Sequence, residues 1–219
     1  NINIYNMNVL ELFSGTHSIG KVLKKEGYNV ISLDRDIDGK CPFNSGYDNS
    51  KNHIQQDILR WDYKKYPVGY FKLITASPVC SWWSQLRDVW TGIKNRKLKG
   101  MDRFITKEDI NNDIDQFGKP MVDKIIEIIE YFNPQFWWIE NPSTGKMKYY
   151  IEEKYPNYNT FYDFDYCQYS NYGYKKSSRF WTNIKNIKPL KCHKDCKNMF
   201  YDEKTNRKKH KITFGSYGK

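Results

Sequence analysis

Residues 8–20 read NVLELFSGTHSIG, the pattern of a short buried strand, a glycine-containing turn and the start of a helix. A second apolar segment, YNVISL at residues 28–33, closes on Asp34. A turn of this kind lets backbone amides approach a nucleotide or an amino-acid carboxylate at a helix N-terminus, and Asp34 could accept hydrogen bonds from both hydroxyls of a ribose. The turn is not GxGxxG, because His17 and Ser18 stand where further glycines would be expected. An ordinary strand–helix turn therefore explains the segment about as well.

The pattern of strands and helices continues along the chain. Residues 71–76 (FKLITA) and 135–139 (QFWWI) are predicted strands, and residues 119–132 have the apolar spacing of a helix. This alternation predicts a doubly wound α/β fold, with a mostly parallel sheet covered on both faces. Ligands of such sheets bind beyond the carboxyl ends of the strands. Residues 87–118 are polar and basic with weak periodicity, which we interpret as a long loop with a short helix.

Size and composition limit the class of protein. A chain of 219 residues is long enough for one domain with a substantial core, and 17% of its residues are aromatic. The longest apolar stretches are far shorter than the roughly 20 residues of a membrane span, and the N-terminus lacks the pattern of a secretory signal. Five cysteines without regular spacing predict reduced thiols in an intracellular protein. We expect a monomer, with oligomers left open.

The net charge of +11 is concentrated toward the C-terminus. Residues 174–219 contain 14 Lys and Arg against 3 Asp and Glu, and a second basic cluster lies at residues 93–103. Basic clusters beside aromatic residues suit a nucleic-acid surface, where phosphates supply most of the affinity. A solvated, lysine-rich face is an equally good explanation of the charge alone.

The segment ASPVCSWWS, residues 76–84, places Cys80 where the chain leaves a predicted strand. An isolated cysteine is usually a small buried residue, but a thiolate stabilised by nearby basic groups becomes a nucleophile. Glu140 follows the next predicted strand in the segment WWIENPSTG and should therefore lie near Cys80. A carboxyl held among apolar neighbours such as Trp137 and Trp138 would have a raised pKa and could donate a proton. A nucleophile and a carboxylic acid beside a nucleoside-shaped pocket suit attack on an electron-poor ring.

Four motifs in this order resemble those of the cytosine-C5 DNA methyltransferases, and most closely those of the short viral and phage branch. They are LELFSGTHSIG, ASPVC, IENP and YCQYSNYGYKKSSRFWTNI, and the resemblance spans roughly Val9 to Ile184. It implies a methyltransferase-type sheet, S-adenosylmethionine as cofactor, DNA as substrate and, for a viral protein, a location in the host nucleus or cytoplasm.

The resemblance also implies catalytic roles for individual residues. Cys80 would attack C6 of a flipped-out cytosine, and Glu140 would bond ring N3 and the exocyclic amine. Arg179 would contact the base carbonyl or a phosphate, with Lys176 as the other candidate. One of Trp82 and Trp83 is expected to pack in the core, and the other to contact substrate or cofactor.

Binding residues follow from the same resemblance. The expected cofactor-binding residues are Phe13, Ser14, Gly15, Thr16, His17, Ser18, Asp34, Arg35, Asp57, Ile58, Ser77 and Pro78. The expected nucleic-acid-binding residues are Trp82, Ser84, Arg87, Lys94, Arg96, Lys97, Lys175 and Lys176.

The chain departs from the family pattern in three places. The usual Pro-Pro-Cys is Pro78-Val79-Cys80, and the usual Glu-Asn-Val is Glu-Asn-Pro at residues 140–142. Only about 35 residues follow the arginine-bearing strand, so we expect little or no separate target-recognition domain and short or weak sequence recognition. An RNA substrate, or an inactive relative that binds only cofactor or nucleic acid, is the alternative. We divide the chain into a catalytic domain, residues 1–186, and a basic extension, residues 187–219, packed on or next to it.

The C-terminal pattern CHKDC…KKH invites a zinc site made of Cys192, Cys196 and His210, with His193 nearby. The C-x3-C spacing permits zinc, but two cysteines and one distant histidine are fewer than the four converging ligands of a structural site. We favour a basic tail facing nucleic acid and predict no metal site. Cys41 and Cys167 are interpreted as structural, with Cys167 on a core strand.

Overall fold

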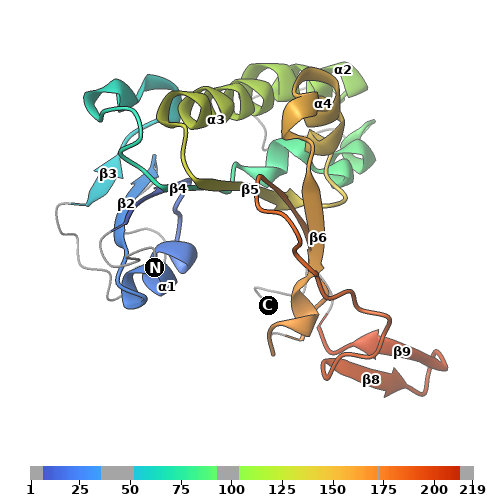
Figure 1. Cartoon of the computed structure of the whole chain (residues 1–219). Coiled ribbons are helices and arrows are strands. Elements are labelled where there is room, and N and C mark those ends of the chain that lie inside the picture. The colour runs from blue at the N-terminus through green and yellow to red at the C-terminus, as the bar shows by residue number, and fades with distance from the viewer. Residues whose placement is uncertain (1–6, 36–51, 93–103, 172, 213–219) are drawn as a thin grey trace.

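The computed structural model describes residues 7–35, 52–92, 104–171 and 173–212, and its centre is a seven-stranded sheet (Figure 1). The strand order is β3-β2-β1-β4-β5-β7-β6. The strands are β1 Asn8–Leu12, β2 Asn29–Asp34, β3 His53–Gln55, β4 Leu73–Ala76, β5 Phe136–Pro142, β6 Phe161–Asp165 and β7 Ser177–Thr182. β7 runs antiparallel to both of its neighbours, and the other pairs are parallel. The predicted doubly wound, mostly parallel sheet is confirmed.

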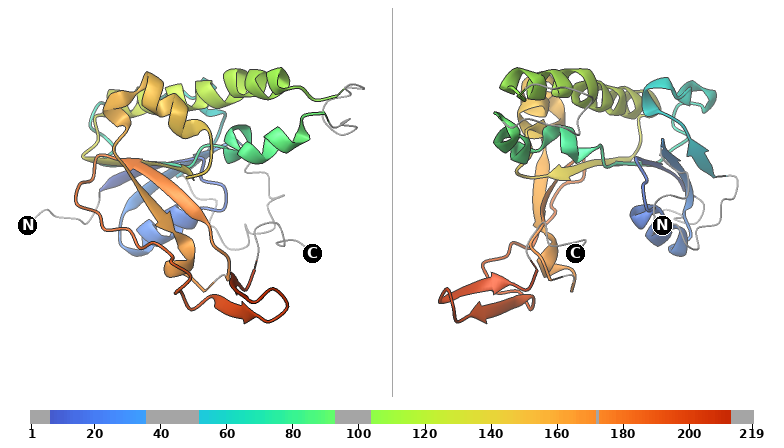
Figure 2. Two further views of the ribbon diagram at one scale, coloured as in Figure 1. Left: turned by 90° about the vertical axis from the view of Figure 1, so that its right-hand side faces the viewer. Right: turned by 180° about the vertical axis from the view of Figure 1, so that it is seen from behind.

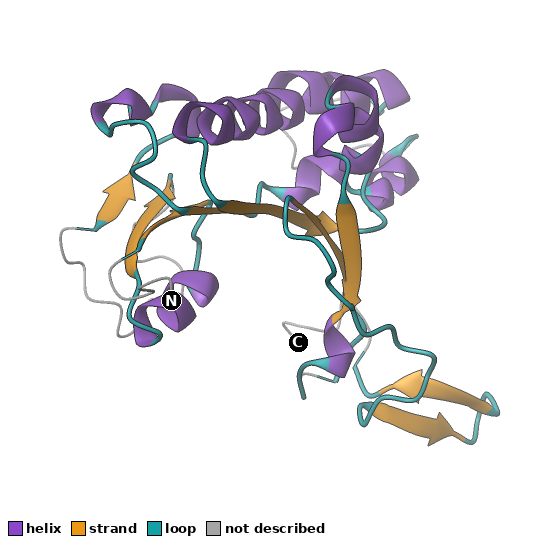
Figure 3. Ribbon diagram, in the orientation of Figure 1, coloured by secondary structure: helices purple, strands orange, loops and turns teal. Residues whose placement is uncertain are grey.

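Helices cover the two faces of this sheet unequally. The α-helices are α1 Ser18–Lys25, α2 Lys107–Asp113, α3 Lys119–Phe132 and α4 Met147–Lys154. α1 lies on one face, and α2, α3 and α4 lie on the other (Figures 2 and 3). None of the helices in the described part of the chain is long and apolar enough to cross a membrane.

Short helical turns complete the connections between these elements. The 3-10 turns are η1 Ile58–Arg60, η2 Tyr63–Lys65, η3 Cys80–Trp83, η4 Gln85–Trp90, η6 Pro156–Tyr158 and η7 Tyr166–Gln168, and η5, Ile114–Gly118, is a π-helical turn. The described part of residues 87–118 is more helical than predicted. A capping box between Thr106 and Asp109 starts α2, which η5 joins directly to α3. Polar residues at helix ends satisfy backbone groups without creating an apolar period, so this helix was hard to see in the sequence.

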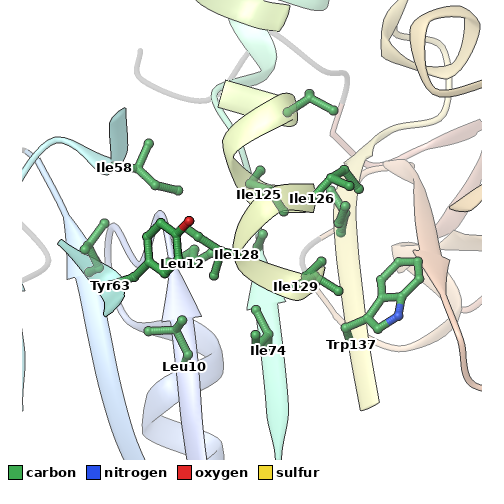
Figure 4. Close-up of a cluster of buried hydrophobic side chains, with 14 of the residues drawn as sticks. Leu10, Leu12, Ile58, Tyr63, Ile74, Ile125, Ile126, Ile128, Ile129 and Trp137 are labelled. Carbon is green, nitrogen blue, oxygen red and sulfur yellow. The ribbon is translucent and has the colours of Figure 1, made fainter. Parts of the chain in front are cut away.

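The main core lies between the sheet and α3 (Figure 4). α3 buries one apolar stripe, which includes Ile125 and Ile129, against strand residues such as Leu10 and Ile74. Burial of each such side chain contributes about 1.5–3 kcal/mol, so the strand ends are held on a rigid base.

The C-terminal part of the chain forms a two-stranded hairpin, β8 Met199–Asp202 and β9 Arg207–His210, which lies beyond the ends of β6 and β7 (Figure 1). Two backbone hydrogen bonds join the extension to the sheet-bearing part, from Asp165 N to Leu190 O and from Ile212 N to Gly173 O. Cys167 lies in η7, just past β6, so its predicted place on a core strand is wrong. The chain turns there because Tyr166 N bonds back to Lys176 O across the β6–β7 connection.

Candidate active site

The carboxyl ends of β4 and β5 bring the cysteine and Glu-Asn-Pro motifs together. The two strands are parallel neighbours, with Ala76 paired to Ile139, so the segments that follow them emerge at the same edge. Asn141 Nδ2 donates to Pro78 O at 3.0 Å, which ties the cysteine loop to the end of β5. Cys80 follows this anchored proline and is exposed.

Cys80 lies at the wall of a cavity of about 920 Å³. The cavity is bounded by η3, η4, the segment after β5 and the residues that lead into β7. Its lining includes Cys80, Ser84, Arg87, Trp90, Asn141 and Lys176. The volume exceeds what one heterocyclic base fills, and most of the lining residues carry polar or charged groups that could orient a polar substrate.

Lys176 connects the two reactive groups of the site. Its Nζ lies 3.4 Å from Glu140 Oε1, and its charge also interacts with the Cys80 thiol. Burial disfavours the ammonium, but the attraction of Glu140, Tyr166 and Cys80 outweighs it and raises the pKa of Lys176. The sequence predicted apolar neighbours for Glu140, such as Trp137 and Trp138. In the structure, the Glu140 carboxylate also has a cationic partner, Lys176.

Arg179 does not lie beside Glu140 and Lys176. It pairs with Asn141 of β5 across the sheet, whereas Glu140 pairs with Phe180, so strand alternation places Arg179 and Glu140 on opposite faces. Its guanidinium makes a bidentate ion pair with Asp163, at 2.7 and 3.0 Å, and covers the Phe161 ring. The structure thus leaves Arg179 outside the Cys80 cavity.

The tryptophans have different environments. Trp83 is buried and stacks on Tyr150, whereas Trp82 is half-buried and stacks on Phe117. Trp90, which the sequence analysis missed, is exposed and lines the cavity. Trp90 lies in a polar, basic stretch with weak periodicity, so no pattern singled it out.

Arg87 is a buried cation at the cavity wall. It pairs with Asp113 of α2, and its guanidinium lies 5.4 Å from the Trp82 ring and 5.8 Å from the Trp90 ring. Its Nη1 is buried and has no hydrogen-bond partner among the described residues. An unsatisfied buried donor costs about 1–3 kcal/mol. Ser84 caps η4 by accepting from Leu86 N.

The remaining predicted nucleic-acid contacts fall in two places. Lys175 pairs with Asp165 at 3.3 Å and lines the cavity beside Lys176. Lys94, Arg96 and Lys97 lie outside the described residues.

The turn after β1 has an unusual backbone. Phe13, Gly15 and His17 have φ values of 57°, 46° and 55°, a left-handed conformation that costs a non-glycine residue about 1–3 kcal/mol. Successive amides in such turns form anion-binding concavities. Gly15 N donates to Asp34 Oδ2 at 2.8 Å, so the turn and the end of β2 meet as predicted for a nucleotide site.

The donor set of this turn fits a nucleoside-containing cofactor. The Ser14 hydroxyl is buried and has no partner among the described residues, and a Cβ built on Gly15 would meet only open space. Thr16 and Ser18 bond to each other through their hydroxyls at 2.8 Å. The carboxylate of Asp34 stands at the same edge.

The other expected cofactor residues lie around the neighbouring strand ends. Gln56 N bonds to Asp34 O, which sets Asp57 next to the end of β2, where it caps η1 by accepting from Leu59 N. Arg35 is exposed and Ser77 half-buried, while Pro78 is buried behind the cysteine loop. Ile58 is buried in the main core, so its side chain supports the site from behind.

Glu11 is a buried acid that the sequence analysis quoted but did not assign. Its carboxylate accepts from Gly20 N at 2.9 Å and from Ser32 Oγ at 2.7 Å, and His17 Nδ1 lies 3.6 Å away. His17 in turn meets His53 edge to face at 4.3 Å, and burial and the neighbouring His17 lower the pKa of His53. The sequence signal that could have singled out Glu11 was an acidic residue inside an otherwise apolar strand. Glu11 fixes the turn after β1 by holding the start of α1.

Comparisons of sequence and of structure identify known proteins that are similar to this chain. A probable DNA (cytosine-5)-methyltransferase of Frog virus 3 (isolate Goorha) is 34% identical over 217 residues, which cover 97% of this chain and 88% of that protein. No protein-family model matches the chain. The solved structure of the Entamoeba histolytica methyltransferase EhMeth has a TM-score of 0.53 at 15% identity, covering 84% of this chain and 56% of that one. S. pombe Dnmt2 methyltransferase has a TM-score of 0.49 at 19% identity, with 84% and 53% covered. The chain spans about half the length of these solved structures, and the likeness to EhMeth shows a shared fold.

Proposed function

Because the chain belongs to the family of DNA (cytosine-5)-methyltransferases, we propose that it transfers a methyl group from S-adenosylmethionine to C5 of cytosine in DNA, with Cys80 as the covalent nucleophile. The observation that carries the proposal is the joint position of Cys80 and of Lys176, paired with Glu140, at one cavity wall.

The proposed reaction begins at Cys80. Its thiolate forms a bond to C6 of the base, and the C5–C6 π electrons move so that C5 becomes nucleophilic. S-adenosylmethionine, when bound, would supply an electrophilic methyl group to C5 and would leave as the neutral thioether S-adenosylhomocysteine. Removal of the C5 proton by a base, such as a water molecule, then expels Cys80 as a thiolate and restores the ring.

Glu140 and Lys176 stabilise the charge that develops during attack. Glu140 is proposed to bring a proton that it donates to ring N3 and to accept from the exocyclic amine through its other oxygen, and the Lys176 ammonium is proposed to face the base carbonyl and the thiolate. Charges fixed in advance beside a reacting group cost no reorganisation during the reaction, which is why such groups raise the rate. Lys176 replaces Arg179 in this role because Arg179 is held by Asp163 on the other face of the sheet.

The turn after β1 is proposed to bind the cofactor. Phe13, Ser14 and Gly15 would line its site, Asp34 would accept from the ribose hydroxyls, and Asp57 would accept from the adenine amine. The open space at Gly15 and the unpartnered Ser14 hydroxyl support this assignment.

DNA is the proposed macromolecular substrate. The target atom lies inside the duplex stack, so the cytosine must be flipped out to reach Cys80. Arg87, Trp90 and Lys175 border the cavity and supply a cation, an aromatic face and a second cation for the displaced strand.

The first test is transfer of labelled methyl groups from S-adenosylmethionine to duplex DNA, followed by nucleoside analysis. The wild-type chain should produce 5-methylcytosine, and Cys80→Ala should lower turnover by about 10³-fold or more with cofactor binding retained. Normal methylation by Cys80→Ala would refute the assignment of Cys80 as the nucleophile. If the labelled methyl group appeared in RNA but not in DNA, the assignment of DNA as the substrate would be wrong.

A second test separates an enzyme from a binding protein. DNA that contains 5-fluorocytosine should form a stable covalent adduct, because fluorine at C5 blocks the release of Cys80. The adduct should be absent with Cys80→Ala. If cofactor and DNA bind tightly but no adduct forms with the wild-type chain, the protein is a binding relative without turnover.

A further inference from the structure

Four potential metal ligands converge at the base of the C-terminal hairpin. Cys167 comes from η7, Cys192 and Cys196 from the segment after β7, and His210 from the end of β9. Their ligand atoms all lie within 4.8 Å of one another. We propose that Cys167, Cys192, Cys196 and His210 bind one structural zinc ion, a site that the proposed methyl transfer does not use.

The spacing of the ligand atoms fits a tetrahedral ion. With Zn–S of about 2.3 Å and Zn–N of about 2.0–2.1 Å, tetrahedral angles require about 3.5 Å between sulfur and nitrogen. The His210 Nε2 atom lies 3.5 Å from Cys192 Sγ and 3.5 Å from Cys196 Sγ. Three sulfurs and one imidazole nitrogen, all supplied by the protein, form a closed ligand set typical of structural zinc.

Hydrogen bonds around the cluster hold its ligands in place. Asp165 Oδ2 accepts from Cys192 N at 2.8 Å. The buried Asn198 side chain donates to Cys167 O at 2.9 Å and to Ser170 O at 2.7 Å. Such outer partners fix the orientation of metal ligands.

Hydrophobic burial does not account for the folding of this segment. In residues 183–212, all of which are described, the only buried side chains are Cys192, Cys196 and Asn198. A unit with so little core normally requires a disulfide or a metal. None of the four described cysteines forms a disulfide, and zinc would use all three thiols of the cluster and the histidine.

The sequence concealed the fourth ligand. Cys167 is separated from Cys192 by β7, and only the β6–β7 pairing brings η7 to the extension. The interpretation of the C-terminal pattern as a tail without metal rested on the lack of a fourth ligand. Cys167 supplies it.

The test measures the metal content of the full chain, produced reduced in zinc-supplemented medium without a metal-binding tag. Elemental analysis should give about one zinc per chain, and X-ray absorption should give three sulfur ligands and one nitrogen ligand. His210→Ala and Cys167→Ser should each lower the zinc content severalfold. The matched controls His193→Ala, an exposed histidine beside Cys192, and Cys80→Ser should keep it.

A second measurement covers the case in which the ligand variants fail to fold. Replacement of the wild-type metal by Co²⁺ should give the intense visible absorption of tetrahedral cobalt–thiolate coordination. Chelation should then make the 183–212 segment cleavable by protease, and added zinc should restore its protection. Zinc well below one equivalent, equal zinc in all variants, or a disulfide between cluster cysteines in freshly isolated protein would each overturn the proposal.

Discussion

Lys176 and Arg179 are three residues apart, yet their side chains have different tasks. Lys176 precedes β7 and meets Glu140 at the cavity, whereas Arg179 lies within β7 and is neutralised by Asp163. The motif KKSSR identifies the segment, but not which of its cations lies at the Cys80 cavity. That choice depends on the register of β7 against β5, which pairs Phe180 with Glu140. No local pattern encodes a register between strands that are far apart in sequence, so the sequence left both residues as candidates.

Replacement of either cation by methionine tests this assignment. Lys176→Met should lower kcat by about 10²–10³-fold, as for loss of one charge-stabilising donor. Arg179→Met should leave kcat within a few fold and lower thermal stability, because Asp163 loses its bidentate partner. Steady-state kinetics with melting curves of both variants give the measurement. The reverse order of kcat effects would restore Arg179 as the catalytic cation.

Gly20 is a second residue whose identity is dictated by its neighbours. A methyl group added there would overlap the Glu11 carboxylate, which is itself fixed by Gly20 N and Ser32. Gly20→Ala should therefore cost about 1–3 kcal/mol of unfolding free energy and weaken cofactor binding, because the turn before α1 shifts. Val22→Ala, at an exposed position of the same helix, is the control and should change both quantities little. Denaturant unfolding and cofactor titration measure them, and unchanged cofactor affinity in Gly20→Ala would contradict the coupling of Glu11 to the turn.

At the scale of elements, strong apolar periods made some segments predictable. The helix expected at residues 119–132 is α3, Lys119–Phe132, and the four expected strands are β1, β2, β4 and β5 with ends shifted by a few residues. β6 (FYDFD) was missed because its acidic residues interrupt the apolar pattern. One of these acids, Asp163, forms an ion pair with Arg179. Cys80 and Glu140 could be proposed from the sequence because Cys80 follows, and Glu140 lies near the end of, a segment with a clear apolar signal. Lys176 beside Glu140, and Cys167 beside Cys192, depend on tertiary pairing.

Asp123 joins α3 to α4 and the segment after it. Its carboxylate accepts from Tyr150 Oη at 2.5 Å, Tyr155 Oη at 2.6 Å and Lys154 Nζ at 2.8 Å. Burial opposes its charge, but these hydrogen bonds outweigh burial and hold the pKa of Asp123 below its ordinary value. Its contribution to stability is therefore present above the ordinary carboxylate pKa and is lost as the pH falls through the lower folded-state value.

Asp123→Ala should accordingly lower the free energy of unfolding by about 2 kcal/mol at neutral pH, because two tyrosine hydroxyls lose their acceptor. Asp115→Ala, which removes an exposed pair with Lys119, is the control and should cost less than about 0.5 kcal/mol. Urea unfolding at pH 7 and pH 3 measures both variants. The difference between Asp123→Ala and wild type should shrink at the lower pH, and a difference independent of pH would contradict the charged role of Asp123.

At the scale of the whole molecule, one buried tyrosine, Tyr63, and two half-buried ones, Tyr155 and Tyr158, make the free energy of unfolding depend on pH in the alkaline range. Burial and a hydrogen bond to Glu127 raise the pKa of Tyr63 to about 12, and burial likewise raises the pKa of Tyr155 and of Tyr158 to about 12. Between pH 10 and pH 12 the unfolded chain loses these protons while the folded chain keeps them. The folded state then binds more protons, so stability must fall as the pH rises through this window.

Tyr63→Phe isolates one part of this dependence. A tyrosine that is ionised in the unfolded chain and neutral in the folded chain lowers the free energy of unfolding by up to about 1.4 kcal/mol per pH unit. The free energy of unfolding of Tyr63→Phe should therefore fall less steeply than that of wild type between pH 10 and pH 12. Reversible unfolding followed at several alkaline pH values measures the slope. Identical slopes in the two proteins would show that Tyr63 titrates alike in its folded and unfolded states.

The strand order also determines how the sheet can grow during synthesis. β2 pairs with β1, β3 with β2, β4 with β1 and β5 with β4. The partner of each of these strands has therefore been synthesised before the strand itself. β6 is different, because its neighbour in the described sheet is β7, which leaves the ribosome later. Until Thr182 has emerged, β5 keeps an open edge beside Glu140, and open edges recruit strands from other chains. A translational pause between residues 142 and 177 would therefore expose the nascent chain to aggregation at the strand that carries Glu140, the proposed partner of the cytosine ring.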